Sequence, residues 1–469
     1  MSLPSVGVSA PAHTPSPTGG SLAIARRVVR PLDRVLPYAG PGLAAVLGLV
    51  ALGHRSLDTD EAATVAGARG AFGDVVDTAL SHDPARAGYL ALLRPVVAWN
   101  DGEIWVRLPS VVAVVVAAIA AYRLGRRIAG RHAGAAASLI LATSVGVVML
   151  SRSVDPLALA LAAMLLSSAL FARAVDHGNV VWWAVYAVSA ALLPLTHPVA
   201  ASALAAQIAA LAVARREVDL RLALPAVAVA TVESVFFLTA AAIDRADAAD
   251  GAGPLTLHAL GLGLGRGAGW SPIVVALGVW GVVVLFRRAI RTGSGTWQPV
   301  LVTGLAVMPL AGVLVAGIAL PVYPRSALVV AAGGIALAAG IGLVSIPDRN
   351  LRLAGAAAVA VIAAAAIATA AAEKPKENWR EAARLVHAKT TSRDTVVVLP
   401  ARSRAAFAYY APDVRTGLVG RGDAVSVVVV GDPALAVATA RPVVSPPRYA
   451  LLSADRTGTS LVVQRWVRP

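Results

Sequence analysis

Three carboxylates lie close together early in the chain, at Asp58, Asp60 and Glu61, directly after the first long apolar run. A carboxylate at a membrane surface can have a raised pKa where apolar groups surround it, and it can then accept a proton from a hydroxyl group. Asp60 and Glu61 would point about 100° apart on a helix, so one would act as the base and the other as its helper. The alternative is structural, since aspartate and threonine side chains also cap helix N-termini. The residues alone leave both interpretations open.

Further candidates for substrate binding lie near the predicted membrane boundaries. Asp83 could bind a sugar hydroxyl group or, together with the first acids, a divalent metal ion; its structural alternative is a turn before Pro84. Arg152 and Arg325 could bind a lipid-linked phosphate, because guanidinium groups pair with phosphate oxygens through two hydrogen bonds. Each arginine could equally lie at the interface as a snorkelling side chain. His197 falls in the same region, at the outer end of a predicted span.

These residues belong to a chain with the composition of a membrane protein. Of its 469 residues, 57% are hydrophobic and 14% are charged, against about 25% charged residues in soluble domains. The chain has no cysteine, which excludes disulfide bonds and thiolate metal sites. Its net charge of +15 fits arginines collected in cytoplasmic loops, and no basic module with interleaved aromatic residues points to nucleic acid. The composition predicts an α-helical multi-span membrane protein without a nucleic-acid partner.

Polar and apolar stretches divide the chain into a tail, a membrane domain and a C-terminal domain. Residues 1–34 predict a disordered cytoplasmic tail; a cleaved signal peptide is the alternative, but its charged residues would lie unusually far from the start. Residues 35–372 predict about eleven transmembrane helices, with an external loop at 54–107 that carries one or two helices along the membrane surface. The predicted spans are Val35–Gly53, 108–124, 133–150, 156–174, 180–196, 198–214, 222–243, 271–286, 299–320, 326–346 and 352–372.

Arginine clusters set the expected orientation. They follow the second, sixth, eighth and tenth predicted spans, beginning at Arg123, Arg215, Arg287 and Arg349. All of them fall on the side of the N-terminal arginines. Because arginine collects on the cytoplasmic side of a plasma membrane, the N-terminus is expected in the cytoplasm and the loop 54–107 outside. An odd number of spans then places the C-terminal domain outside as well.

Residues 373–469 predict a small external α/β domain. Asn378–His387 has the spacing of an amphipathic helix. Four short β-branched runs bounded by Gly, Pro and Asp predict strands. The domain could cover the active face or bind an acceptor, or it could be a stabilising cap without substrate contact. The predicted strands are Thr395–Leu399, Ala424–Val430, Tyr449–Leu452 and Ser460–Val463.

Six short motifs stand in order along the chain. They are Asp60-Glu-Ala-Ala-Thr64, Asp83-Pro-Ala-Arg-Ala-Gly-Tyr89, Gly102-Glu-Ile-Trp-Val-Arg-Leu-Pro-Ser110, Ser151-Arg-Ser-Val-Asp-Pro-Leu-Ala158, Pro324-Arg325 and Asn378-Trp-Arg-Glu-Ala-Ala383. The set resembles the C-type (GT-C) membrane glycosyltransferases. The resemblance is to the branch of protein O-mannosyltransferases and lipid A aminoarabinose transferases, and especially to actinobacterial mannosyltransferase-like proteins. Each motif is weak alone, but their order and their common membrane side make the set specific.

The resemblance implies an inverting transfer of mannose or another hexose or pentose from a polyprenyl-phosphate donor. The reaction would serve cell-envelope glycan, glycolipid or glycoprotein synthesis at the external face of the plasma membrane. It implies Asp60 as the base, Glu61 as the group that orients Asp60 or the acceptor, and Arg152, Arg325 and Arg86 as the groups that neutralise the departing phosphate. The acceptor could be a glycan, a lipid or a protein.

The chain departs from the family pattern at four positions. Arg86 stands where the family has His, Asp155 where it has Arg, and Leu157 and Ser326 where it has Tyr. The exchange at Asp155 removes a positive charge from a motif that would bind the donor phosphate. A changed donor or acceptor is one consequence of these departures, and an inactive relative is another.

Two other classes of function compete with the enzyme. A lipid or solute transporter would place polar residues near the bilayer midplane, often in two repeated halves. Here the acids concentrate in one external loop, only Glu233 lies deep in a predicted span, and the sequence has no evident internal repeat. A non-catalytic membrane protein of envelope assembly is the third class. The distribution of the acids favours the enzyme.

Overall fold

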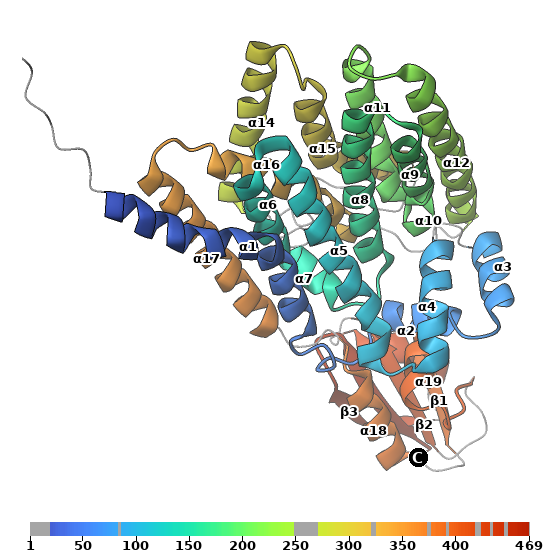
Figure 1. Ribbon diagram of the computed structural model, residues 1–469. Helices are drawn as coiled ribbons and strands as arrows, with labels where there is room; N and C mark the ends of the chain where they lie inside the picture. Colours follow the sequence, from blue (N-terminus) through green and yellow to red (C-terminus); the bar gives the residue numbers. More distant parts are fainter. Residues whose placement is uncertain are drawn as a thin grey trace, which may run out of the picture.

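The computed structural model consists of a long helical bundle with a small α/β domain at one end (Figure 1). It describes residues 19–82, 86–247, 271–319, 325–372, 377–390, 394–417, 424–431, 435–444 and 449–468. The first-loop helices are α2 (Thr59–Gly67), α3 (Phe72–His82) and α4 (Ala87–Trp99). The bundle helices are α1 (Gly19–Leu49), α5 (Glu103–Ala129), α6 (Arg131–Thr143), α7 (Val145–Ser151), α8 (Pro156–His177), α9 (Val180–Ala191), α10 (Leu193–Thr196), η2 (Pro198–Ala201), α11 (Ser202–Ala214), α12 (Leu220–Asp247), α14 (Pro272–Thr292), α15 (Trp297–Ala319), η4 (Arg325–Ala331), α16 (Ala332–Val344) and α17 (Arg349–Ala372).

The bundle helices differ in how well they fit a membrane. Within the described ranges, four stretches are long and apolar enough to cross one: α5, α8, α14 and Trp297–Val315 of α15. The pair α6 and α7, bent by 66°, would make a fifth. Other apolar helices, such as Leu328–Val344, are shorter. The multi-helical membrane class is therefore confirmed, whereas eleven spans remain a prediction.

The start of the first helix differs from expectation. The sequence predicts a disordered tail up to residue 34, but α1 begins at Gly19, so the tail boundary is wrong for residues 19–34. This segment contains Ala, Leu and Arg, which favour helix, and the helix continues through Pro31 into the apolar run. Residues 1–18 lie outside the described part of the chain.

Glycines let the bundle helices approach closely. A Cβ on Gly281 of α14 would clash with the carbonyl of Ala338 in α16, and a Cβ on Gly342 would clash with the carbonyl of Leu277. Backbone contact of this kind is how helices pack in lipid, where apolar side chains gain little by leaving one another. Packing α16 against α14 therefore requires glycine at both positions.

Basic turns gather at the end of the bundle opposite the α/β domain (Figure 1). Arg288 Nη1 of α14 donates to the carbonyl of Ile128 in α5 at 3.3 Å, and Arg127 pairs with Asp176 of α8. The turns after α5, α8 and α14 therefore meet. The structure thus brings Arg127 and Arg288, from two of the arginine clusters expected on one side of the membrane, close to one another.

The C-terminal domain is a four-stranded mixed sheet with three helices. Its strands β1 (Thr395–Leu399), β2 (Ala424–Val430), β3 (Ala450–Arg456) and β4 (Leu461–Val467) lie in the order β1-β2-β4-β3. β1 pairs in parallel with β2, and the other two pairs are antiparallel. The helices are α18 (Trp379–Lys389), α19 (Arg404–Tyr410) and α20 (Ala436–Val444), with a short η5 (Ala401–Ser403) before α19.

One hydrophobic core joins this sheet to the first-loop helices. Val65 of α2 and Tyr89 of α4 pack in the same cluster as Trp379 of α18 and Phe407 of α19, and all four are at most 1% exposed. Burying side chains of this size stabilises the contact by about 1.5–3 kcal/mol each. The C-terminal domain is therefore packed as one body with α2, the helix that carries the acids.

Candidate active site

The acid-rich stretch forms the start of α2. Asp58 is the N-cap, and its Oδ1 accepts a hydrogen bond from the backbone N–H of Glu61 at 2.9 Å. Glu61 returns the contact, since its Oε2 accepts from the Asp58 backbone N–H at 3.1 Å. This reciprocal pair is a capping box, which satisfies two N–H groups that a helix start leaves open. The helix-cap interpretation is confirmed for Asp58.

Glu61 is held inside the protein by Arg107 of α5. Arg107 donates to both carboxylate oxygens, at 3.1 Å from Nε and 2.6 Å from Nη2, and the two residues are 3% and 6% exposed. The backbone N–H of Val154 donates to the same carboxylate at 2.9 Å. Sequence reasoning did not single out Arg107, although it lies in the Gly102–Ser110 motif. Besides its bond to the Asp58 backbone, the Glu61 carboxylate therefore fixes α2 against α5 and the segment just before α8.

Arg107 also holds the segment that precedes α2. Its Nη1 donates to the carbonyls of Leu52 at 3.0 Å and Arg55 at 2.8 Å, and its Nη2 donates to that of Ser56 at 3.1 Å. From the other side, Tyr410 of α19 accepts from the backbone N–H of Leu57 at 2.6 Å. The connection between α1 and α2 is thus clamped between the bundle and the C-terminal domain.

A charged cavity of about 540 Å³ opens beside this segment. Its acids are Asp58, Glu61, Asp155 and Glu377, and its basic residues are His54, Arg55, Arg107 and Arg152. Apolar residues of α7 and η4 line the remaining wall. A cavity lined by both cationic groups and carboxylates, between a membrane bundle and a polar domain, can bind the head of an anionic lipid.

Two guanidinium groups meet in this cavity. Arg152 Nε and Nη2 both donate to the Leu47 carbonyl at the end of α1, at 2.9 and 2.6 Å. Burial and then the charge of Arg55 lower the pKa of Arg152. The two positive charges repel each other, and an anion bound between them would be attracted to both. Arg152 and Arg55 therefore bring two positive charges to this cavity.

The acids of the cavity are electrostatically linked. Burial and then the charge of Glu61 raise the pKa of Asp58 to about 6, with Asp60 and Glu377 adding to the effect. Burial also raises the pKa of Asp155, whose Oδ1 accepts from the Leu157 backbone N–H at 2.8 Å, while the charge of Arg86 opposes that rise. Both Asp58 and Asp155 thus keep their protons to a higher pH than an ordinary aspartate does.

The remaining predicted site residues fall in different places. Asp60 is exposed on the first turn of α2, close enough for its charge to act on Asp58 and Asp155. Within the described ranges no group hydrogen-bonds to its carboxylate. Arg86 is the N-cap of α4 and lies near Asp155, so a positive charge stands beside the position where the family resemblance expected an arginine.

His197 is engaged locally instead of lining the cavity. Its Nδ1 accepts a hydrogen bond from the backbone N–H of Val199 at 3.2 Å, which caps η2. Arg325 is the first residue of η4, and Val329 of that helix lines the cavity. Asp83 lies outside the described residues. No group of three or more His, Asp or Glu in the described ranges is arranged to hold a metal ion.

A separate apolar groove of about 580 Å³ runs between α4, α5, α8 and α10. Gly88 of α4 is two residues from Arg86, and Leu159 of α8 is one helical turn from Asp155, so one end of the groove lies near the charged site. The groove is lined by Gly88, Leu92, Val96, Trp99, Trp105, Leu108, Pro109, Val112, Ala113, Val116, Leu159, Ala162, Ala163, Leu166, Leu192, Leu195 and Thr196. Its size and lining suit a hydrocarbon chain.

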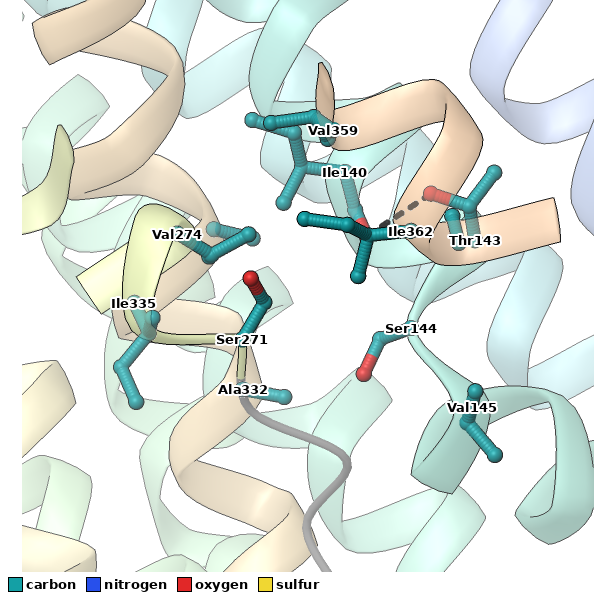
Figure 2. Close-up of a pocket in the computed structure, with 12 residues that line it drawn as sticks. Ile140, Thr143, Ser144, Val145, Ser271, Val274, Ala332, Ile335, Val359 and Ile362 are labelled. Carbon is teal, nitrogen blue, oxygen red and sulfur yellow. Dashed lines mark hydrogen bonds between the residues drawn. The ribbon is translucent and has the colours of Figure 1, made fainter. Parts of the chain in front are cut away.

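A smaller pocket of about 50 Å³ lies at the break between α6 and α7. Figure 2 shows the hydroxyl groups of Ser144 and Ser271 pointing into it among aliphatic side chains, while Thr143 bonds back to its own helix. Val145 lines both this pocket and the charged cavity. The pocket has room for a water molecule or two but not for a lipid chain.

Comparisons with known proteins bear on the sequence family and the fold. Residues 87–242 match the family model of dolichyl-phosphate-mannose-protein mannosyltransferases, and a search of curated protein sequences gave no match. ArnT from Cupriavidus metallidurans bound to undecaprenyl phosphate superposes with a TM-score of 0.53 at 14% identity, over 90% of this chain and 96% of that one. The same protein in the apo state gives 0.50 at 13% identity, over 96% and 98%.

An archaeal protein shows the same fold. The Archaeoglobus fulgidus oligosaccharyltransferase, in complex with zinc and sulfate, superposes with a TM-score of 0.50 at 14% identity over 79% of this chain. This chain spans 61% of that protein's length. The likenesses show a common fold, and the family match covers α4 to α12. The family match is thus limited to residues 87–242, whereas the likeness of fold to ArnT extends over 90% of the chain.

Proposed function

We propose that this protein transfers a sugar from a polyprenyl-phosphate donor to a hydroxyl group of an envelope glycan, lipid or protein at the external face of the plasma membrane. The observation that carries the proposal is the charged cavity, which Arg55, Asp58 and Arg152 all line at the junction of bundle and C-terminal domain. The name of the matched family includes dolichyl-phosphate-mannose, and the ArnT structure holds undecaprenyl phosphate. Both fit a lipid-linked donor, with mannose as the first sugar to test.

Asp60 is the base in this proposal. Its exposed carboxylate takes the proton of the acceptor hydroxyl group while that oxygen attacks the anomeric carbon. The bond between this carbon and the phosphate oxygen breaks with inversion, and the lipid phosphate leaves with both electrons. Asp58 keeps negative charge next to the sugar, which develops positive charge in the transition state. Glu61 acts as a positioning residue through Arg107.

The donor lies across two recesses in this proposal. The phosphate meets Arg152 and Arg55 in the charged cavity, and Arg86 adds positive charge near Asp155. The polyprenyl chain follows the apolar groove between α4 and α8, where burial of hydrocarbon stabilises binding by about 0.8 kcal/mol per CH₂ group. The basic turns at the opposite end of the bundle support a cytoplasmic location for that end.

Changing Arg152 to Gln is expected to raise the KM for the lipid-linked donor about 10- to 100-fold, with a smaller effect on kcat. The reason is the loss of a charge-assisted hydrogen bond to phosphate. Transfer kinetics at varied donor concentration measure it. Arg216→Gln, an exposed arginine after α11, is the matched control. An unchanged donor KM in Arg152→Gln would move the phosphate away from this cavity.

The transfer rate is expected to fall as the pH drops through about 6, because Asp58 then gains a proton and loses its charge. The sign follows from the raised pKa, since the group is ionised above that value and neutral below it. Asn is also a good N-cap, so Asp58→Asn should keep the helix start. Its transfer rate should be low and should not change across pH 5–8, because the pH–rate profile loses its acid limb, the fall in rate at about pH 6. If the transfer rate of Asp58→Asn still fell with pH as in the wild type, another group would be responsible for the acid limb.

The function itself is tested with the purified full chain in nanodiscs. Labelled polyprenyl-phosphate mannose and arabinose are supplied separately with envelope lipids, glycans and proteins as acceptors. Transfer of label from either donor, lost in Asp60→Asn, supports the proposal. Release of label from neither donor, with protein that binds both, would contradict it.

A further inference from the structure

Glu377 reaches from the C-terminal domain to the start of α2. Its Oε2 accepts hydrogen bonds from the backbone N–H of Thr59 at 2.9 Å and from the Thr59 hydroxyl at 2.7 Å. The indole N–H of Trp379 donates to the same oxygen at 2.7 Å. Thr59 is the residue between Asp58 and Asp60. One carboxylate oxygen therefore fixes the backbone from which both acids project.

A second set of contacts reinforces this hold. The Ser56 hydroxyl donates to the Glu377 carbonyl at 3.0 Å and accepts from the Trp379 backbone N–H at 3.2 Å. Tyr410, which accepts from Leu57, also donates to Glu103 at the start of α5. The residues on both sides of the α2 N-cap are thus attached to the C-terminal domain.

Docking of the C-terminal domain does not by itself require a charged side chain at Glu377. The residue is 7% exposed, and its three donors on Oε2 are all neutral groups. Among the described residues no ion pair to Glu377 is found, and burying a carboxylate without one is costly, so an apolar or amide side chain would dock the domain at lower cost. The side chain lines the charged cavity, and its charge acts on Asp58. Its position and charge both point toward the site.

We propose that Glu377 is a positioning residue for sugar transfer, by which the C-terminal domain completes the active site. It holds Thr59, which lies between the cavity-lining Asp58 and the exposed Asp60, and it keeps negative charge at the junction of the two domains. This inference rests on the proposed function. It makes the C-terminal domain part of the catalytic unit instead of a separate cap.

Two variants of the full chain test this role. Glu377→Ala removes the acceptor, and we expect kcat to fall about 100-fold, as small displacements of catalytic groups do, with little change in donor KM. Glu377→Gln keeps an acceptor oxygen for Thr59 and should recover most of the rate. Because it removes a charge that holds the pKa of Asp58 up, it should move the acid limb of kcat to lower pH. The proposal would be overturned if the acid limb of the kcat–pH profile stayed at the same pH in Glu377→Gln, or if Glu377→Ala kept wild-type kcat.

Glu381→Gln is the matched control, because Glu381 lies four residues away on α18 and pairs with Arg384 at the surface. It should leave kcat and the acid limb unchanged. Hydrogen exchange of the amides 57–64 separates this inference from the proposed function, since it needs no substrate. If exchange at these amides is faster in Glu377→Ala but the wild type transfers no sugar, the proposed function is refuted and the anchoring of α2 by Glu377 is supported. Unchanged exchange would refute the anchoring even with active enzyme.

Discussion

Replacing Asp60 with Asn is expected to lower kcat for sugar transfer by about 10²- to 10⁴-fold, the usual contribution of a general base. The side chains are nearly equal in size, and the carboxylate is exposed at the first turn of α2. The cap of this helix is Asp58, so the helix start does not depend on Asp60. The thermal unfolding midpoint should therefore stay within a degree or two of wild type, and donor binding should be retained. Label transfer from lipid-linked sugar, measured beside unfolding, tests both parts.

Asp74 supplies the matched control for Asp60. It is also an exposed aspartate in the first turn of a short helix, α3, within the same loop. Asp74→Asn should keep wild-type kcat, so a loss confined to Asp60→Asn assigns the base. Retention of more than a tenth of the rate in Asp60→Asn would shift the assignment to Asp58, and the loss in Asp58→Asn would then exceed the loss in Asp60→Asn.

Strands and helices could be predicted from the sequence where their own residues are sufficient to specify them. Strands β1 and β2 have the predicted bounds, because runs of valine bounded by polar residues specify a buried strand. Helix α18 starts within one residue of its predicted start. In contrast, α19 and α20 were missed, because Arg404–Tyr410 is only two turns long and Pro442 interrupts the second helix. Their stability comes from the shared core and not from their own sequence.

Only some residues of the candidate site could be predicted from the sequence. Asp58, Asp60 and Arg152 could be found because acids after a span and arginine at a boundary stand out in an apolar chain. Glu377 and Arg107 could not, although both lie in or beside quoted motifs. Their roles depend on partners 318 and 46 residues away. Only the packing of the C-terminal domain and α5 around the start of α2 reveals those partners.

The same dependence on distant partners explains which predicted residues were not brought together. His197 stands at the end of a predicted span, as expected, but its ring serves the cap of η2. Asp155 serves the cap of α8 and keeps its place in the cavity, where Arg86 supplies positive charge nearby. The altered motif therefore retains a cation next to the site, on a different helix.

Replacing Glu61 with Ala is expected to destabilise the protein by about 3–5 kcal/mol, the usual cost of removing one partner from a buried ion pair. Arg107 would remain 3% exposed, and a guanidinium group does not lose its proton to relieve the missing charge. The capping box would be broken as well. Tryptophan fluorescence during thermal or denaturant unfolding in detergent should show a clearly lower midpoint. Residual activity should fall because α2 is no longer fixed against α5.

A paired replacement separates the buried charge from the position of α2. Glu61→Leu with Arg107→Met removes both charges and should recover much of the stability, since apolar side chains can fill a buried ion-pair site. Activity should stay low in this double variant, because the carbonyls of Leu52, Arg55 and Ser56 lose the donor that holds the segment before α2. Equal recovery of stability and transfer would show that the ion pair serves folding alone. Recovery of stability without transfer would show that the pair aligns the acids at the start of α2 with the cavity.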